Sequence, residues 1–110
     1  MKEEHDLAGW DITHGAKTEW VPWGGEGAPA RAKVLGTGDG YYLVLVEARA
    51  GYIGSPHEHA NAEFSYVVSG TVEHQGVPMH AGDGYVAAAG SAHTGFSVST
   101  DATYVLAFKL

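Results

Sequence analysis

Short apolar runs separated by glycine-rich turns make up most of the chain. The longest of these runs, 41–48, is nearly all apolar, which predicts a strand that is buried on both faces. The other runs are rich in β-branched and aromatic residues, which is typical of strands. These further predicted strands are 17–21, 31–35, 57–59, 64–68, 71–74, 77–80, 85–88, 91–98 and 102–108. The pattern therefore predicts an all-β protein with many tight turns.

The first 16 residues are polar and show little periodicity, so we expect an N-terminal segment, 1–16, ahead of a β domain, 17–110. Three apolar side chains would let this segment pack on the domain or on a partner: Leu7, Trp10 and Ile12. Without such packing the segment would be loose. His5 and His14 are predicted to be solvated rather than to bind a metal.

Residue types that bind metals are clustered on the predicted strand 57–59 and just before the next one, 64–68. His57 and His59 have i, i+2 spacing, so on a strand their side chains point to the same face. Pro56 before them fits a strand start and cannot continue a helix. Glu63 follows four residues after His59, and His93 comes later in a glycine-rich segment. Three imidazoles and one carboxylate are a complete ligand set for a divalent transition metal.

Other histidines lack this context. A lone histidine is more often a surface or core residue than a ligand, whereas the spacing H-x-H-x3-E with a histidine downstream favours a metal site. His74 and His80 lie on either side of the predicted turn 75–76, so the hairpin could bring them together. We nevertheless expect them to be exposed hairpin residues rather than a second metal site.

Two segments resemble the two sequence motifs of the cupin superfamily. The first runs from Gly51 to Gly70 with the pattern G-x5-H-x-H-x3-E-x6-G and has no departures. The second begins at Gly82, and eleven residues separate it from Gly70. It departs at Ala88, where the family usually has proline, and at Ser97, where it usually has asparagine. Neither of these two positions is a metal ligand in the family.

The resemblance covers about residues 40–110. Over this range the chain is similar to small single-domain microbial cupins, which are RmlC-like and include the acetylacetone-dioxygenase and ChrR-like kinds. It implies a double-stranded β-helix, the cupin jelly-roll barrel, with a metal inside. The ligands that it implies are His57, His59, Glu63 and His93. A jelly-roll interior of this size admits only a small ligand. The predicted pocket residues are Tyr42, Val44, Phe64, Met79, Tyr85, Phe96 and Ser97.

The expected cofactor is one divalent transition metal. Four protein ligands leave open coordination positions on a five- or six-coordinate ion, unlike the closed tetrahedral sites of structural zinc. Nitrogen and oxygen ligands together suit Fe, Mn, Ni, Co, Cu or Zn. The motifs place no other titratable group in the pocket, so the chemistry would rest on the metal as Lewis acid or redox centre. Neither motif contains arginine or lysine, which disfavours a highly anionic substrate.

Three functions are compatible with these residues. Resemblance to acetylacetone-dioxygenase-like cupins implies an oxygen-dependent dioxygenase acting on a small diketone-like or aromatic carbonyl compound. A non-redox isomerase or lyase would use the metal as Lewis acid. A metal- or ligand-binding module without turnover would be similar to the sensor domain of ChrR-type anti-sigma factors. Absence of cysteine and of a second domain counts against a full regulator of that type.

Composition limits the partners. The formal net charge of −7 argues against nucleic acid or an anionic membrane as partner. There is no cysteine, so no disulfide framework or thiolate site is possible. The start of the chain lacks the apolar region of a signal peptide, and no apolar run could span a bilayer, so a cytoplasmic protein is expected.

The apolar strand 41–48 also bears on oligomeric state. In a barrel one face of this strand fills the interior, and the other needs cover from the N-terminal segment or from a second subunit. We therefore expect a homodimer, which is also common among small cupins, with a small-molecule ligand as the other partner.

Overall fold

The computed structural model describes residues 8–93 and 95–109 and confirms the predicted all-β class. The expectations for His5 and Leu7 concern residues outside this range. The largest sheet has six antiparallel strands: β1 (Val21–Pro22), β2 (Ala30–Gly38), β3 (Tyr41–Ala48), β11 (Ala102–Lys109), β5 (Glu63–Ser69) and β8 (Gly84–Ala87), in that order. A second sheet is formed by β10 (Phe96–Val98), β6 (Thr71–His74) and β7 (Val77–His80), and a third by β4 (His57–Glu58) and β9 (Ala92–His93).

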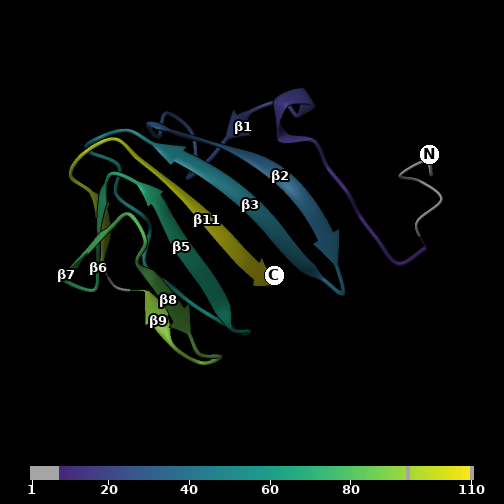
Figure 1. Ribbon diagram of the computed structural model, residues 1–110. Coiled ribbons are helices and arrows are strands. Elements are labelled where there is room, and N and C mark those ends of the chain that lie inside the picture. Colours follow the sequence, from purple (N-terminus) through teal and green to yellow (C-terminus); the bar gives the residue numbers. More distant parts are fainter. Residues whose placement is uncertain (1–7, 94, 110) are drawn as a thin grey trace.

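The long strands β2, β3, β11 and β5 curve side by side, with the short strands β6, β7, β8 and β9 on the β5 side and β1 beside β2 (Figure 1). The last strand, β11, lies between β3 and β5, so distant parts of the chain must meet to complete the sheet. The turn at Gly70 has a φ of +79°, and a Cβ there would overlap the carbonyl oxygen of Asp101. Only glycine fits this close approach.

One face of the large sheet forms the core. On β3 the buried side chains alternate as Val44, Val46 and Ala48, and on β11 as Ala102, Tyr104 and Leu106. The prediction that 41–48 is buried on both faces is therefore wrong for this single chain, since Leu43 is 43% exposed. Strand alternation sends its side chain to the opposite face of the sheet.

That opposite face carries what we call the outer apolar row. Ala107 pairs with Leu43 on one side and Phe64 on the other, and Phe64 pairs with Val86. These four residues form the row across β3, β11, β5 and β8. Leu43, Phe64 and Val86 are all exposed in the single chain.

The described part of the N-terminal segment lies against β2 instead. The Asp11 carboxylate accepts a hydrogen bond from the Thr37 amide, and the Gly15 carbonyl accepts one from Lys33. Arg31 and Lys33 both lie over the Trp20 ring. Trp10 and Ile12, expected as packing residues, are 73% and 42% exposed. None of these contacts covers the outer apolar row.

Two predicted strands differ from the structure. Segment 17–21 begins in a short 3₁₀ helix, η2 (Gly15–Lys17), because the Lys17 and Thr18 amides bond back to the carbonyls of His14 and Gly15. Segment 91–98 is divided between β9 and β10, which pair with different strands and belong to different sheets. Within the described residues, no helix is long and apolar enough to cross a membrane.

Candidate metal centre

Backbone pairing brings the three predicted histidine ligands together. His57 on β4 lies directly opposite His93 on β9. The amide of His59 donates to the carbonyl of Ser91 at 2.8 Å, and the carbonyl of His59 accepts from the amide of Gly90 at 2.6 Å. The first motif is thus clamped against the second by main-chain hydrogen bonds, which explains why both motifs are needed for one site.

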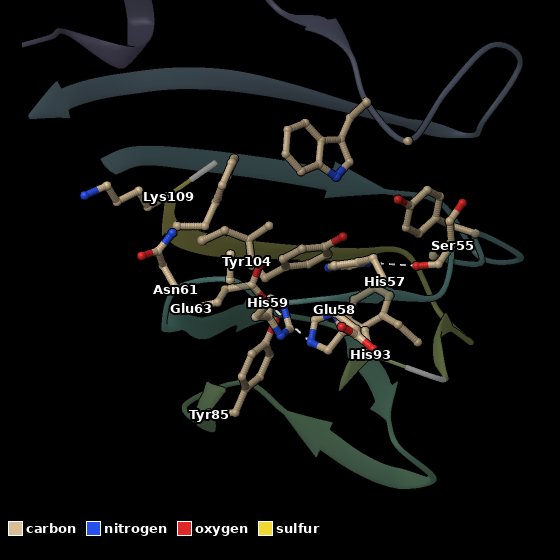
Figure 2. Close-up of a pocket in the computed structure, with 18 residues that line it drawn as sticks. Ser55, His57, Glu58, His59, Asn61, Glu63, Tyr85, His93, Tyr104 and Lys109 are labelled. Atoms are coloured by element: carbon tan, nitrogen blue, oxygen red, sulfur yellow. Dashed lines mark hydrogen bonds and ion pairs between the residues drawn. The ribbon is translucent and has the colours of Figure 1, made fainter. Parts of the chain in front are cut away.

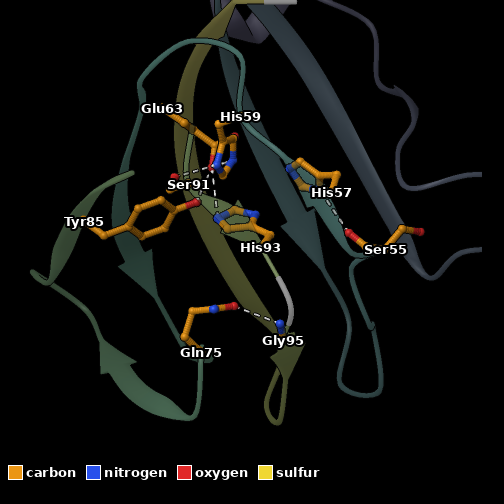
Figure 3. A network of polar contacts seen from close by, with 9 residues as sticks. All are labelled: Ser55, His57, His59, Glu63, Gln75, Tyr85, Ser91, His93 and Gly95. Carbon is orange, nitrogen blue, oxygen red and sulfur yellow. Dashed lines mark hydrogen bonds and ion pairs between the residues drawn. The ribbon is translucent and has the colours of Figure 1, made fainter. Parts of the chain in front are cut away.

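The three imidazoles converge on a common point, as Figure 3 shows. One potential ligand atom from each of His57, His59 and His93 lies within 4.8 Å of the others. The Nδ1 atom of His57 donates to the Ser55 carbonyl at 2.9 Å, because a carbonyl can only accept, and this leaves Nε2 with its lone pair. Nδ1 of His59 lies 3.2 Å from the Ser91 hydroxyl. Such contacts fix the ring orientations of metal-binding histidines.

Two of the inward nitrogens are buried and have no hydrogen-bond partner among the residues that the structure describes. They are Nε2 of His59 and Nε2 of His93. Buried polar atoms are nearly always paired, so these two require an explanation. Burial, followed by the neighbouring His59, His74 and His57, lowers the pKa of His93 to about 4. His93 is therefore neutral near pH 7, and a cation at the convergence point would satisfy both nitrogens. The residues fit a divalent metal.

Glu63, the predicted fourth ligand, lies beside this cluster. Its Oε2 atom is 3.4 Å from Nε2 of His59 and 3.5 Å from Nε2 of His93. The Tyr85 hydroxyl donates to the same oxygen at 2.7 Å. Burial and then the Glu63 charge raise the pKa of Tyr85, so its hydroxyl remains a donor. Glu63 thus faces the imidazoles. The group whose potential ligand atoms all lie within 4.8 Å of one another contains the three histidines and not Glu63.

His74 differs from its prediction as an exposed hairpin residue. It is half-buried, and its ring stacks on Tyr85 at 4.3 Å between centroids and meets His93 at 4.5 Å. Nδ1 of His74 is buried without a hydrogen-bond partner in the described chain. His80 is exposed, as expected, and pairs with Thr71 at the other end of the hairpin. The signal for His74 was alternation, because it shares a face with buried Val72.

A cavity of about 460 Å³ opens onto the histidine cluster (Figure 2). Its lining combines the three histidines and Glu63 with many aromatic side chains. The aromatic residues are Trp23, Tyr52, Tyr85, Phe96, Tyr104 and Phe108. The site is therefore a polar end that could hold a metal ion, joined to an apolar chamber of small-molecule size.

The seven predicted pocket residues are placed unequally. Tyr85 and Phe96 line the cavity, but the other five do not. Val44 and Met79 are buried in the core, and Tyr42 stacks on Phe108. These three side chains pack against other residues and do not face the chamber.

The remaining two predicted pocket residues, Phe64 and Ser97, lie outside this lining, and strand geometry explains their positions. Phe64 follows inward-facing Glu63 on β5, so alternation turns it outward, and it is 47% exposed. Ser97 does not continue the strand of His93, because β9 ends at His93 and β10 begins at Phe96. Phe96 faces the cavity in its place.

The sequence reasoning missed the wall contributed by the last strand and an early loop. Tyr104, Leu106 and Phe108 alternate inward on β11 and all line the cavity. Trp23, from the loop after β1, packs on Phe108 with ring centroids 6.0 Å apart. The alternation on β11 was visible in the sequence, but which face meets the metal end depends on the sheet order.

Comparison with known proteins places these features in a family context. Residues 10–109 match the family described as ChrR Cupin-like domain. No curated protein matches the sequence.

Solved structures share the fold at low sequence identity. An RmlC-like cupin from Shewanella frigidimarina is 25% identical, with a TM-score of 0.74, and the match covers 89% of this chain and 88% of that one. An acetylacetone dioxygenase from Acinetobacter johnsonii is 13% identical, with a TM-score of 0.77 and coverage of 99% and 78%. The Rhodobacter sphaeroides complex of SigE with the anti-sigma ChrR gives 21% identity, a TM-score of 0.73 and coverage of 87% and 52%. These similarities confirm the predicted jelly-roll fold.

Proposed function

Because the chain belongs to the cupin superfamily, as a ChrR cupin-like domain, we propose that it is a metal-dependent dioxygenase for a small diketone-like or aromatic carbonyl compound. The observation that carries this proposal is the convergence of three imidazoles, two of them with unpartnered buried nitrogens, at one end of an apolar cavity. The resemblance to acetylacetone dioxygenases lies in the fold and adds the reaction class as a hypothesis.

Each residue of the centre has a distinct proposed task. His57, His59 and His93 hold the ion, and Glu63 supplies a fourth, anionic ligand from beside them. Tyr85 orients the Glu63 carboxylate through its hydroxyl. A bound divalent transition metal with open positions, whether Fe, Mn, Ni, Co, Cu or Zn, supplies Lewis-acid or redox chemistry.

The cavity suits a small substrate of low charge. Its volume of about 460 Å³ lies in the range of small-molecule sites. Among the described residues that line the cavity, Lys109 is the one lysine or arginine. Its Nζ lies 5.8 Å from the ring of Tyr41, a residue outside the lining. Aromatic side chains would pack on an apolar body and exclude water from the histidine end. A carbonyl compound with no charge or a single charge fits these walls.

Oxygen uptake tests the reaction. The chain is loaded with Fe(II), and an oxygen electrode records consumption with a panel of β-diketones and hydroxylated aromatic ketones, with His59→Ala as control. We expect uptake that depends on substrate and metal, because His59 presents a buried nitrogen to the site. Conversion without oxygen would instead indicate an isomerase or lyase. Product analysis identifies the products of oxygen-dependent or oxygen-independent conversion.

A second candidate is a binding module without turnover. The match to the ChrR Cupin-like domain favours it, since the solved anti-sigma relative contains a similar domain within a regulatory complex. In that case the metal-loaded chain would bind a small molecule tightly and would convert none of the compounds in the panel, with or without oxygen.

We also propose that the chain forms a homodimer through the outer apolar row. Leu43, Phe64 and Val86 are exposed on neighbouring strands, and the described N-terminal contacts lie elsewhere, on β2. A contiguous apolar face of this kind is uncommon on a monomer.

Sedimentation equilibrium at micromolar concentration should give twice the mass of the chain. Leu43→Lys should yield a monomer, whereas Val77→Lys, at an exposed position on β7, should leave the dimer intact. A monomeric parent chain would refute the proposal.

A further inference from the structure

Tyr104 is a buried residue that lines the cavity, and its hydroxyl is not one of the fully enclosed unpartnered polar atoms, so it retains access to the cavity. The residue is 3% exposed and lines the cavity from β11. Its hydroxyl makes no hydrogen bond to any described residue, in contrast to Tyr85, which donates to Glu63. Buried tyrosine hydroxyls usually have a partner. The missing partner of Tyr104 must therefore be sought in the cavity.

The surroundings hold this hydroxyl in place and keep it protonated. The Tyr104 ring packs edge-to-face on Phe96 at 5.5 Å, and Phe96 in turn packs on Tyr52 at 6.2 Å. Burial, then Tyr52, then the Glu63 carboxylate raise the pKa of Tyr104. Tyr104 lines the same cavity as the three histidines and Glu63. Tyr104 thus presents a fixed hydrogen-bond donor to the cavity.

We infer that Tyr104 is a ligand-binding residue, whose hydroxyl donates a hydrogen bond to an oxygen of the small molecule held at the histidine cluster. This inference rests on the proposed function and narrows its substrate class. One ligand oxygen would face the metal held by His57, His59 and His93, and a second would accept from Tyr104. A dicarbonyl compound, or a carbonyl compound with a neighbouring hydroxyl, provides both acceptors on one small body.

The rest of the cavity agrees with a ligand of this kind. Phe96 and Leu106 line it with apolar surface, and Trp23 and Phe108 lie together in its wall. None of these four side chains offers a hydrogen-bond acceptor to the Tyr104 hydroxyl, because the indole N–H of Trp23 can only donate. The Tyr104 hydroxyl therefore favours ligands that carry a second oxygen. A ligand without one would leave this donor unpaired, which weakens binding.

The test compares Tyr104→Phe with the parent chain, both loaded with Co(II), whose visible absorption reports ligand binding. Acetylacetone is the probe with two oxygens, and azide is the probe without a carbonyl. We expect Tyr104→Phe to bind acetylacetone about tenfold more weakly, which corresponds to the loss of one hydrogen bond. Azide affinity and Co(II) affinity should not change.

A matched variant and a stability measurement separate binding from structure. Tyr42→Phe removes a hydroxyl from a residue that stacks on Phe108 outside the cavity lining, and it should bind acetylacetone as the parent does. Since the Tyr104 hydroxyl is unpartnered without ligand, Tyr104→Phe should not lower the melting temperature of the ligand-free chain.

Three results would overturn the inference, and they can be distinguished. If Tyr104→Phe retains Co(II) and binds acetylacetone as tightly as the parent, Tyr104 has no role in ligand binding and the proposed function is untouched. If the parent binds Co(II) but not acetylacetone, the dicarbonyl class fails together with the inference. If the parent binds no Co(II), the proposed metal centre itself fails.

Discussion

Replacing His93 with alanine should weaken divalent metal binding on the order of 100-fold or more, because loss of a ligand exceeds the roughly 10–100-fold effect of losing a ligand's own hydrogen-bond partner. His93 Nε2 is buried and unpartnered, and its strand pairs directly with that of His57. The variant removes a nitrogen from the centre while the backbone pairing of β4 and β9 persists. Competition titration with a chromophoric chelator measures the change.

The control for this variant is His80→Ala. His80 is exposed on β7 and lies 3.3 Å from the Thr71 hydroxyl, far along the hairpin from His74. It should bind metal as the parent does. Metal should also raise the melting temperature of the parent and of His80→Ala but not of His93→Ala, since a ligand stabilises only a folded state that binds it. Equal metal content in His93→Ala and the parent would contradict the site assignment.

Replacing Glu63 with glutamine should lower the affinity for the metal by about tenfold, which is less than the effect of losing a histidine. The carboxylate lies 3.4 Å and 3.5 Å from the Nε2 atoms of His59 and His93, so an ion between them would be attracted by its charge. Glutamine keeps the shape and an oxygen that can still accept from Tyr85. The comparison is a metal titration of Glu63→Gln beside His59→Ala at one pH.

Glu58→Gln is the matched control for charge. Glu58 belongs to the same motif and lines the cavity, but it is exposed on β4. Its neutralisation should leave metal affinity nearly unchanged, since solvent screens an exposed charge. If Glu63→Gln instead binds metal like the parent while small-molecule affinity collapses, the centre has three histidine ligands and Glu63 belongs to the pocket.

Local sequence patterns were sufficient for most strands. The predictions 41–48, 71–74 and 77–80 coincide with β3, β6 and β7, and 102–108 ends one residue short of β11. Each is an apolar or alternating run bounded by turn residues, and such signals are local. The failures arise from interactions that those signals do not include. The turn at Gly15–Lys17 is fixed by its own backbone hydrogen bonds, and the break after His93 by pairing with two different strands.

The histidine cluster was predictable for a different reason. His57 and His59 are close in sequence, and the spacing to Glu63 and His93 resembles motifs whose members all serve one site. The structure brings the three histidines together through β4, β9 and the two bonds at His59. The role of Glu63 as a ligand stays a prediction.

The apolar part of the site was less accessible to sequence reasoning. Tyr104 and Phe108 on β11 face the cavity because β11 is inserted between β3 and β5, a non-local arrangement. Trp23 arrives from a loop whose position depends on β1 pairing with β2. Alternation could have identified His74 as inward-facing, but its contact with Tyr85 and His93 depends on the pairing of β6 with β10.

The most direct test of the metal centre is a crystal structure of the chain loaded with one of these metals, with anomalous diffraction recorded at the metal's absorption edge. We predict a single peak at about 2.0–2.3 Å from an imidazole nitrogen of each of His57, His59 and His93. A peak elsewhere, no peak, or a His93 imidazole nitrogen more than about 4 Å from the ion, well beyond a metal–nitrogen bond, would contradict the account.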